Sequence, residues 1–229
     1  FGFYNPNHAA AFICAILPFA WILLFQRACW QKILGGLLSI ILIFALAFTY
    51  SRAGVLVFIL EALAFAFYFG KKYWKVFFGI GAVLILSLLI SSAVGRFALD
   101  ASASNRIEIW LAGLRLFLGN PLGVGLGNSG EIASAFLLPS DIEIRSLVNS
   151  HLTLLCEFGF IVGALWISLI FYAIKCGYSQ RANPLNFAAL VSFCGLVVSS
   201  GISSAFDWEV LLNPSKFEYI TNVNLAALY

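Results

Sequence analysis

Long apolar runs, most of them free of charge, constrain this chain more than any other feature. Each run holds 17 to 23 residues and at most one charged side chain. A helix of 17 residues is about 25 Å long and the longer runs exceed 30 Å, which matches a hydrocarbon core of about 30 Å. Continuous runs also exclude membrane β-strands, which alternate apolar and polar residues. The predicted spans are Ala9–Phe25, Ile33–Thr49, Ala53–Phe69, Val76–Val94, Leu152–Ile174 and Leu185–Phe206.

The composition points to the same class of protein. Hydrophobic residues make up 62% of the 229 residues and charged residues only 10%, whereas soluble domains carry about 25% charged residues. We therefore expect an all-α fold, a polytopic membrane helix bundle of about six transmembrane helices that forms one domain over residues 1–229. The net charge of +3 is dispersed along the chain, which excludes a nucleic-acid-binding surface.

The start of the chain and its cysteines exclude some forms of processing and stabilisation. The chain begins at Phe1, contains no methionine, and has no basic residue ahead of its first apolar run. We therefore expect a piece of a longer protein, without a cleavable signal peptide at its start. The five cysteines lack metal-ligand spacing, so we expect neither structural disulfides nor a metal site from them.

If the six predicted helices alternate in direction, the charged residues of their links divide unequally between the two sides of the membrane. One side receives seven basic residues and no acidic ones, and the other receives six basic and eight acidic residues. Cytoplasmic loops are enriched in Lys and Arg. The first side is therefore assigned to the cytoplasm, and the protein to the cytoplasmic (inner) membrane. Its seven basic residues are Arg27, Lys32, Lys71, Lys72, Lys75, Lys175 and Arg181.

The one long connection, residues 95–150, is predicted to be an extracytoplasmic loop, and such loops often carry function. Asn105 and Glu108 indicate a capping box at the start of an amphipathic helix, which we expect to lie along the membrane interface. A glycine-rich turn follows at 121–128, whose backbone could approach a ligand closely. The turn is not a nucleotide-binding fingerprint, because Asn128 occupies the third glycine position. The apolar stripe of the helix consists of Ile107, Trp110, Leu111, Leu114, Phe117 and Leu118.

Two arginines and two histidines are candidates for chemistry at the outer surface. Arg52 lies between two apolar runs with almost no loop, and Arg106 opens the interfacial helix, where its charge opposes the helix dipole. A phosphate-bearing ligand would offset both placements, although Arg52 can equally be a snorkelling residue that marks a helix end. His151, at the start of the fifth span, is a candidate general base, and His8 is its rival. A lone histidine at a helix start is nevertheless more often a plain polar residue.

Four acidic residues allow further interpretations. Glu61 lies near the middle of the third predicted span and Glu157 in the second turn of the fifth. Such acids can belong to a proton or ion pathway, or can be hydrogen-bonded inside the bundle. Asp141 and Glu143 can hold a divalent cation with substrate phosphates, but two carboxylates are a weak match and a solvated loop is the favoured interpretation.

Five short motifs follow one another on the extracytoplasmic side of the predicted bundle. They are Asn5-Pro6-Asn7-His8-Ala9-Ala10, Tyr50-Ser51-Arg52-Ala53-Gly54, Arg106 to Trp110, Asn120-Pro121-Leu122-Gly123-Val124-Gly125, and Ser150-His151 with Glu157-Phe158-Gly159. In this order and spacing they resemble the O-antigen ligase and polymerase superfamily. The match runs from residue 5 to about 163, and beyond it only the hydropathy is similar. Members usually have ten or more spans, which agrees with the expectation of a longer chain.

The resemblance implies a metal-independent glycosyltransferase without a cofactor. It would move a glycan from an undecaprenyl-diphosphate carrier to a hydroxyl of a lipid, lipid A core, glycan or protein acceptor, at the membrane face toward the periplasm or exterior. It implies that Arg52 and Arg106 grip the diphosphate and that His151 is the base. Many relatives have Asn directly after this histidine, whereas Leu152 stands here, so Ser150 or Asn149 is left to orient the ring. Residues with a supporting role in this prediction are Asn7, His8, Ser150 and Glu157.

Two functions of other classes remain open. A transporter of an ion or small anion is supported by Glu61 and Glu157, and by superfamily members once proposed to move bicarbonate. The discriminating observation is whether Glu61 faces the bundle interior beside another polar group or stands as an isolated acid. The other alternative is a noncatalytic partner in an envelope-assembly complex. The sequence does not distinguish a ligase from a polymerase, nor does it identify the sugar.

Overall fold

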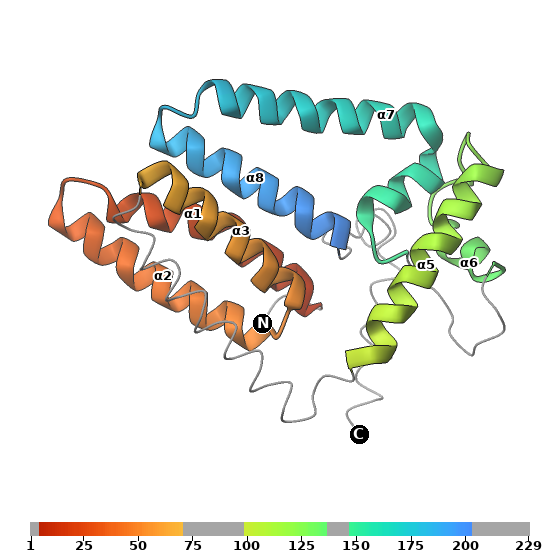
Figure 1. The fold of residues 1–229 in the computed structure, drawn as a ribbon, viewed down its shortest axis with the longest axis horizontal. Helices are drawn as coiled ribbons and strands as arrows, with labels where there is room; N and C mark the ends of the chain where they lie inside the picture. The colour runs from red at the N-terminus through yellow and green to blue at the C-terminus, as the bar shows by residue number, and fades with distance from the viewer. Residues whose placement is uncertain (1–4, 71–98, 137–146, 203–229) are drawn as a thin grey trace.

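A helical membrane bundle is the architecture of the computed structural model, which describes residues 5–70, 99–136 and 147–202, with the backbone alone for 99–105 (Figure 1). Every regular element in these ranges is a helix, and five helices are long and apolar enough to cross a membrane. The predicted class, an all-α polytopic membrane bundle, is therefore confirmed. The predicted span Val76–Val94 and the pair Asp141 and Glu143 lie outside the described residues. The helices are α1 (Pro6–Leu24), α2 (Cys29–Thr49), α3 (Arg52–Phe69), α5 (Leu99–Gly119), α6 (Ser129–Ser134), α7 (Ser150–Ser179) and α8 (Pro184–Ile202).

The start of α1 is set by polar capping rather than by the apolar run. The side chain of Asn5 accepts a hydrogen bond from the backbone N–H of Asn7 at 2.9 Å. Pro6 occupies the first helical position, where its missing N–H removes no hydrogen bond from the helix. The helix therefore begins ahead of the predicted span, which was placed by hydropathy alone.

A two-residue corner joins α2 to α3. Tyr50 ends α2 in the left-handed region with φ 50°, and Ser51 caps α3 by accepting the N–H of Gly54 at 3.1 Å. A Cβ atom at Gly54 would lie only 2.6 Å from the Cβ of Ala10. Glycine is therefore needed here for the close approach of α3 to α1, as small residues permit at helix crossings in membranes.

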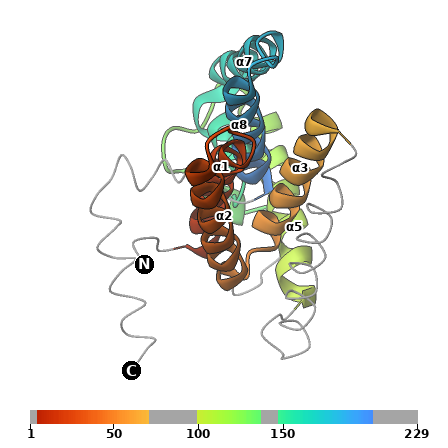
Figure 2. The ribbon, with the colours of Figure 1, turned by 90° about the vertical axis from the view of Figure 1, so that its left-hand side faces the viewer.

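Aromatic side chains fill the centre of the bundle around α1. Trp21 of α1 is fully buried and makes edge contacts with Phe58 and Phe65 of α3, at centroid distances of 5.7 and 5.0 Å. Phe65 also meets Phe187 of α8 at 5.2 Å. α1 therefore lies at the core and packs against α2, α3 and α8. Figure 2, which views the bundle from one end, shows α2 and α8 on either side of α1.

The helices form two distinct ends. We call the starts of α1, α3 and α7 with the last turn of α8 the histidine end, and the links at residues 25–28 and 180–183 with the end of α3 the basic end. At the histidine end, Ser51 donates a hydrogen bond to the side-chain oxygen of Asn7 at 2.7 Å. At the basic end, the hydroxyl of Tyr68 donates to the carbonyl of Ala182 at 3.1 Å. Side chains thus tie non-consecutive helices together at both ends.

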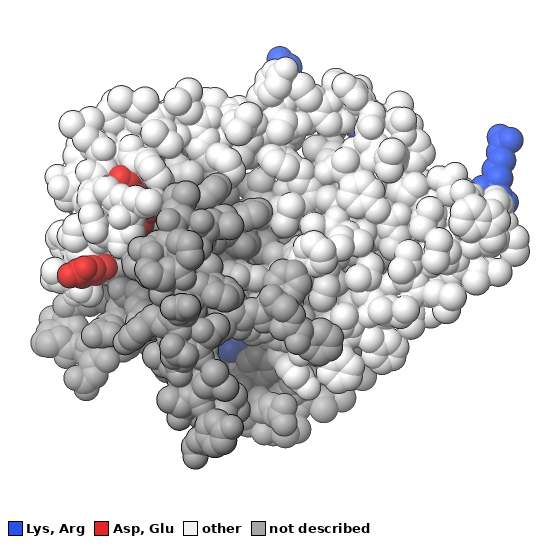
Figure 3. Space-filling view, turned by 180° about the vertical axis from the view of Figure 1, so that it is seen from behind, with Lys and Arg blue, Asp and Glu red and all other residues white. Residues whose placement is uncertain are grey.

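Exposed charges are concentrated toward these ends. The exposed acids Glu108 and Glu131 belong to α5 and α6, which lie beyond the histidine end. Figure 3 shows acidic side chains at one end of the molecule, a protruding basic side chain at the other, and a broad surface with few charges between them. Such a surface suits contact with hydrocarbon, in which charged side chains are costly. The exposed basic residues at the basic end are Arg27, Lys32, Lys175 and Arg181.

The fifth predicted span, Leu152–Ile174, is not one straight helix. Gly159 interrupts α7 with φ 77° and ψ −176°, a backbone conformation open essentially to glycine alone. Figure 1 shows the two arms of α7 running in different directions on either side of this kink. The predicted span corresponds to a helix long and apolar enough to cross a membrane, but hydropathy did not predict the kink, because it does not report the conformation of a single glycine.

The glycine-rich turn after α5 holds the kink in place. The N–H groups of Val124 and Gly125 donate to the carbonyls of Cys156 and Glu157 at 2.9 and 3.0 Å. Beyond the kink, the N–H of Phe160 donates to the carbonyl of Pro121 at 2.9 Å. The turn thus satisfies backbone groups that the kink releases, as buried backbone in a membrane protein requires.

The interfacial helix of the sequence analysis corresponds to α5, with two differences. α5 begins at Leu99 and runs through Asn105, so the predicted capping box is wrong. Its buried face consists of Ile109, Ala112 and Leu116, and the predicted apolar stripe is exposed or half-buried. The periodicity therefore identified a real apolar face, but this face points outward, while α5 packs against α6 and α7 through the opposite one. The location of α5 at the membrane interface stays a prediction.

Candidate functional site

Two of the sequence motifs meet at the starts of α1 and α3. Ser51 donates to the side chain of Asn7 and accepts the N–H of Gly54, so one hydroxyl both caps α3 and fixes α1 beside it. This contact brings the first residues of both helices, with His8 and Arg52, to the same end of the bundle. Arg52 is exposed and His8 half-buried. Helix starts carry the positive end of the helix dipole, so this region favours an anionic ligand.

The kink in α7 gives His151 its position. Asn149 caps the helix by accepting the N–H groups of His151 and Leu152 at 3.1 and 3.0 Å. The indole N–H of Trp166, fifteen residues further along α7, donates to Nδ1 of His151 at 3.0 Å. In a straight helix these residues would stand about 22 Å apart. Only the bend at Gly159 brings them together.

Both ring nitrogens of His151 are hydrogen-bonded. Nε2 lies 2.9 Å from the carbonyl of Val197 in α8, and Nδ1 faces the indole N–H of Trp166. A carbonyl can only accept and an indole N–H can only donate, so these partners assign the proton of the neutral ring to Nε2 and the lone pair to Nδ1. Nδ1 is therefore the nitrogen that can accept a proton.

Arg106 reaches the same helix end. Its Nη1 donates to the carbonyl of Ile202, the last residue of α8, at 3.2 Å. A charged guanidinium forms a strong hydrogen bond with a backbone carbonyl, so this contact joins α5 to α8. Arg106 from α5 and His151 from α7 thus converge on the final turns of α8, between Val197 and Ile202.

The two remaining supporting candidates lie in the arm of α7 before the kink. Ser150 is buried at its first turn. Glu157 is also buried, and the hydroxyl of Ser129, the first residue of α6, donates to its Oε1 at 2.7 Å. Glu157 thus contacts α6 and the glycine-rich turn, whereas His151 contacts α8. This arrangement favours a structural role for Glu157 in holding the loop.

Glu61 lies inside the bundle, away from the histidine end. Its side chain is only 2% exposed, and a Cβ atom at Gly195 of α8 would overlap its Oε1. Within residues 5–70, 99–136 and 147–202, neither carboxyl oxygen has a hydrogen-bond partner. Glu61 therefore faces the interior without a hydrogen bond in the described part of the chain, and the Cys14 thiol of α1 is an electrostatic neighbour.

The sequence analysis did not identify Trp166, the carbonyl of Val197 or the carbonyl of Ile202 as parts of the site. Trp166 was hidden because a straight helix separates it from His151. The available signal was Gly159 inside an apolar run, since an isolated glycine in a helix can mark a bend. The two carbonyls carry no signal of their own, because every residue has one.

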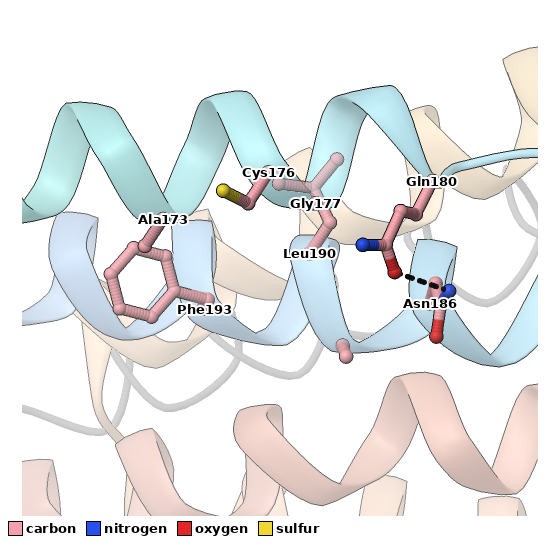
Figure 4. A pocket seen from close by; sticks show the side chains of 8 residues that line it. Ala173, Cys176, Gly177, Gln180, Asn186, Leu190 and Phe193 are labelled. Atoms are coloured by element: carbon pink, nitrogen blue, oxygen red, sulfur yellow. Dashed lines mark hydrogen bonds between the residues drawn. The ribbon is translucent and has the colours of Figure 1, made fainter.

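Two pockets in the described ranges contain none of the predicted site residues, and the larger, of about 750 Å³, lies between α1, α2 and the start of α8 with a mainly apolar lining. The smaller pocket, of about 250 Å³, lies between α7 and α8 toward the basic end, where Asn186 donates to Gln180 at 3.1 Å (Figure 4). No group of three or more His, Cys, Asp or Glu residues gathers within residues 5–70, 99–136 and 147–202. The smaller pocket is lined by Ala173, Cys176, Gly177, Gln180, Asn186, Ala189, Leu190 and Phe193.

Comparison with known proteins gives one match. Residues 37–167 match the family model described as O-antigen ligase, which is more than half of the 229-residue chain. The matched segment contains Arg52, Arg106, His151 and Trp166, and ends before α8. Neither a curated protein nor a solved structure matches the chain.

Proposed function

The chain belongs to the O-antigen ligase family and is thus a membrane enzyme of the ligase or polymerase type, and we propose that it moves a glycan from undecaprenyl diphosphate to an acceptor hydroxyl. The acceptor would be a lipid, lipid A core, glycan or protein. The convergence of Arg106 and His151 on the last turns of α8 carries this proposal. It places a cation suited to phosphate and a group able to accept a proton at one end of the bundle.

Arg106 and Arg52 bind the diphosphate in this proposal. A guanidinium presents a planar set of donors that matches phosphate oxygens. Both side chains belong to the histidine end, Arg52 at the start of α3 and Arg106 beside the end of α8. Arg106 is half-buried, so part of its charge is withdrawn from water and its interaction with an anion is stronger than at an exposed position. These two cations take the role that a metal ion has in other phosphate-dependent transferases.

His151 acts as the general base. The acceptor oxygen forms a bond to the anomeric carbon, the bond between that carbon and the phosphate oxygen breaks, and undecaprenyl diphosphate leaves with the bonding electrons. The acceptor proton passes to Nδ1 of His151, which carries the lone pair. The arginines stabilise the negative charge that develops on the leaving diphosphate. His8, at the start of α1, is the alternative base.

The charge distribution supports an orientation for this reaction. The exposed basic residues at the links of the basic end, among them Arg27 and Arg181, favour a cytoplasmic location for that end. The histidine end then faces the periplasm or exterior, at the outer surface of the cytoplasmic membrane. A diphosphate carrier presents its headgroup at this level, and the starts of α1, α3 and α7 lie there.

A transporter is less well supported. Glu61 is buried in the bundle, but the part of the chain that the structure describes offers its carboxyl group no polar neighbour within hydrogen-bonding distance. A proton or ion pathway needs a series of polar groups or water. We therefore retain the glycosyltransferase as the proposed function.

The test is glycan transfer by the purified full-length protein from an undecaprenyl-diphosphate glycan, in the presence of a chelator. Lipid A core and a second molecule of the lipid-linked glycan serve as acceptors. We expect His151→Ala to abolish transfer and His8→Ala to leave most of it. Arg106→Gln should lower transfer on the order of 100-fold, the scale for removal of a preorganised charge-stabilising donor.

A matched control is Arg115→Gln, which removes an exposed arginine from the same helix. Its transfer rate should remain close to that of the wild type. Full transfer by the His151→Ala and Arg106→Gln variants would contradict the assignment of both residues. Loss of transfer on chelation, restored by a divalent cation, would contradict the absence of a metal in the proposal.

A further inference from the structure

We propose that Trp166 directs the reaction toward transfer and away from hydrolysis. Its indole N–H occupies the basic nitrogen of His151, keeps water from that nitrogen, and gives way only to the hydroxyl of a bound acceptor. This inference rests on the proposed function, in which His151 is the base. Trp166 is a positioning residue in this scheme, because it acts through His151 and not on the reacting atoms.

Nδ1 of His151 can accept only one hydrogen bond at a time. An imidazole nitrogen without a proton has one lone pair, which lies in the plane of the ring. In the structure this lone pair accepts the indole N–H of Trp166 at 3.0 Å. A hydroxyl or a water molecule therefore cannot use Nδ1 while Trp166 does. Whatever displaces the indole from Nδ1 becomes the group that His151 deprotonates.

The other nitrogen offers no alternative. Nε2 donates to the carbonyl of Val197 at 2.9 Å, within the final turns of α8. A 180° turn of the ring about the Cβ–Cγ bond would place the carbon Cδ2 against the indole and the carbon Cε1 against this carbonyl, so that both hydrogen bonds would be lost. Trp166 and Val197 together hold one ring orientation and one tautomer.

Two reactions compete for the same donor. In transfer, the acceptor oxygen attacks the anomeric carbon, the bond to the diphosphate oxygen breaks, and the acceptor proton passes to Nδ1. In hydrolysis, a water oxygen makes the same attack, the same bond breaks, the water proton passes to Nδ1, and the products are free glycan and undecaprenyl diphosphate. Water binds weakly through few contacts, whereas a bound acceptor brings binding energy from its remote parts. At a saturating concentration of acceptor, this binding energy meets the cost of moving the indole from Nδ1, whereas the reaction with water bears the full cost, so the contact favours the acceptor over water.

The experiment compares the full-length wild type with Trp166→Phe, which keeps an aromatic ring and removes the N–H donor. Each protein receives undecaprenyl-diphosphate glycan and a saturating concentration of acceptor, either lipid A core or a second molecule of the lipid-linked glycan. Both the transferred glycan and the free glycan are measured. A neutral hydrogen bond of about 1 kcal/mol corresponds to a factor of about five. We expect the ratio of transfer to hydrolysis to fall about fivefold in Trp166→Phe.

The matched control is Trp30→Phe, because Trp30 is an exposed tryptophan near the basic end. Its ratio should equal that of the wild type. The second readout is the ¹⁵N spectrum of labelled histidine, in which the His151 signals are those lost in His151→Ala. Both proteins should show a protonated Nε2, because the carbonyl of Val197 still accepts its proton, and the signal of the unprotonated Nδ1 should shift in Trp166→Phe, where the hydrogen bond from the indole is lost.

The outcomes separate this inference from the proposed function. An unchanged ratio in Trp166→Phe, or an equal fall of transfer and hydrolysis, would overturn the role of Trp166 while the wild type still transfers glycan. A wild type that transfers no glycan to either acceptor contradicts the proposed function itself. A lower ratio together with a shifted Nδ1 signal supports the inference, since a general loss of folded protein would lower transfer and hydrolysis together.

Discussion

Replacement of Gly159 by alanine tests the link between the kink in α7 and the site. At φ 77° and ψ −176°, an alanine costs about 2 kcal/mol in backbone strain. Its Cβ would also overlap the backbone carbonyl of Leu122, which cannot rotate away as a side chain can. Displacement of the turn would break two or more of the three hydrogen bonds that join it to α7, each worth about 1 kcal/mol. We therefore expect a loss of about 4 kcal/mol in the free energy of unfolding.

Two other glycines provide a graded series for this measurement. Gly125 has φ 89°, but the atom nearest to its added Cβ is a side-chain nitrogen of Asn128 at 3.2 Å. Gly125→Ala should therefore lose only the cost of left-handed backbone, about 1 kcal/mol. Gly119, at the end of α5, has no heavy atom within 4 Å of an added Cβ. Gly119→Ala should cost nothing measurable.

Reversible unfolding in mixed micelles measures the three free energies, and the ¹⁵N spectrum of His151 reports on the site. We expect Gly159→Ala to lose the hydrogen bond between Trp166 and His151, because that contact depends on the bend. A Gly159→Ala protein as stable as Gly119→Ala, with an unchanged His151 spectrum, would refute the reasoning. It would mean that α7 bends for reasons other than the backbone freedom of this glycine.

Three further predictions concern packing and orientation. Ser51→Ala should lower the unfolding free energy by about 1–2 kcal/mol, since the hydroxyl caps α3 and joins it to α1; an unchanged unfolding curve would contradict that role. Gly195→Ala should lower the free energy of unfolding, because the added Cβ overlaps the carboxyl group of Glu61. In a double-mutant cycle, Glu61→Ala should restore part of this free energy, whereas strictly additive effects would exclude the contact. Membrane orientation can be tested in variants that each keep a single cysteine. A thiol reagent that does not cross the membrane should label the exposed Cys29 only from the cytoplasmic side, and Leu126→Cys only from the outer side. The reverse labelling pattern would contradict the proposed orientation.

Hydropathy predicted most of the fold, because membrane spans are long and their composition is distinctive. The five described spans correspond to five predicted runs, with ends that differ by a few residues where caps decide them, as at Pro6. The bend at Gly159 was missed because a span of the right length and composition is compatible with either a straight or a kinked helix. The buried face of α5 was missed for a related reason, since an apolar stripe shows periodicity but not its partner, lipid or protein.

The glycine-rich turn illustrates the same limit for the site. The sequence indicated a turn whose backbone could approach a ligand closely, and the structure shows that this backbone approaches α7. A Cβ at Gly123 would lie 2.5 Å from the carbonyl oxygen of Glu157. Sequence alone indicates that a backbone comes close to something, while the identity of the neighbour depends on tertiary contacts.

The departure from the family pattern after His151 also has a structural explanation. Many relatives have Asn at the position of Leu152, which raised the question of what orients the imidazole ring in this chain. Leu152 packs against the cluster that joins α5 to α7, where a Cβ at Gly113 would lie 2.9 Å from its side chain. An asparagine there would place an amide group in an apolar contact, which is unfavourable unless the amide is hydrogen-bonded. The ring is instead held from both sides by the indole of Trp166 and the carbonyl of Val197. Leu152→Asn alone should therefore leave the His151 tautomer unchanged, and a shift of the proton from Nε2 to Nδ1 would show that the position after the histidine controls the base here as well.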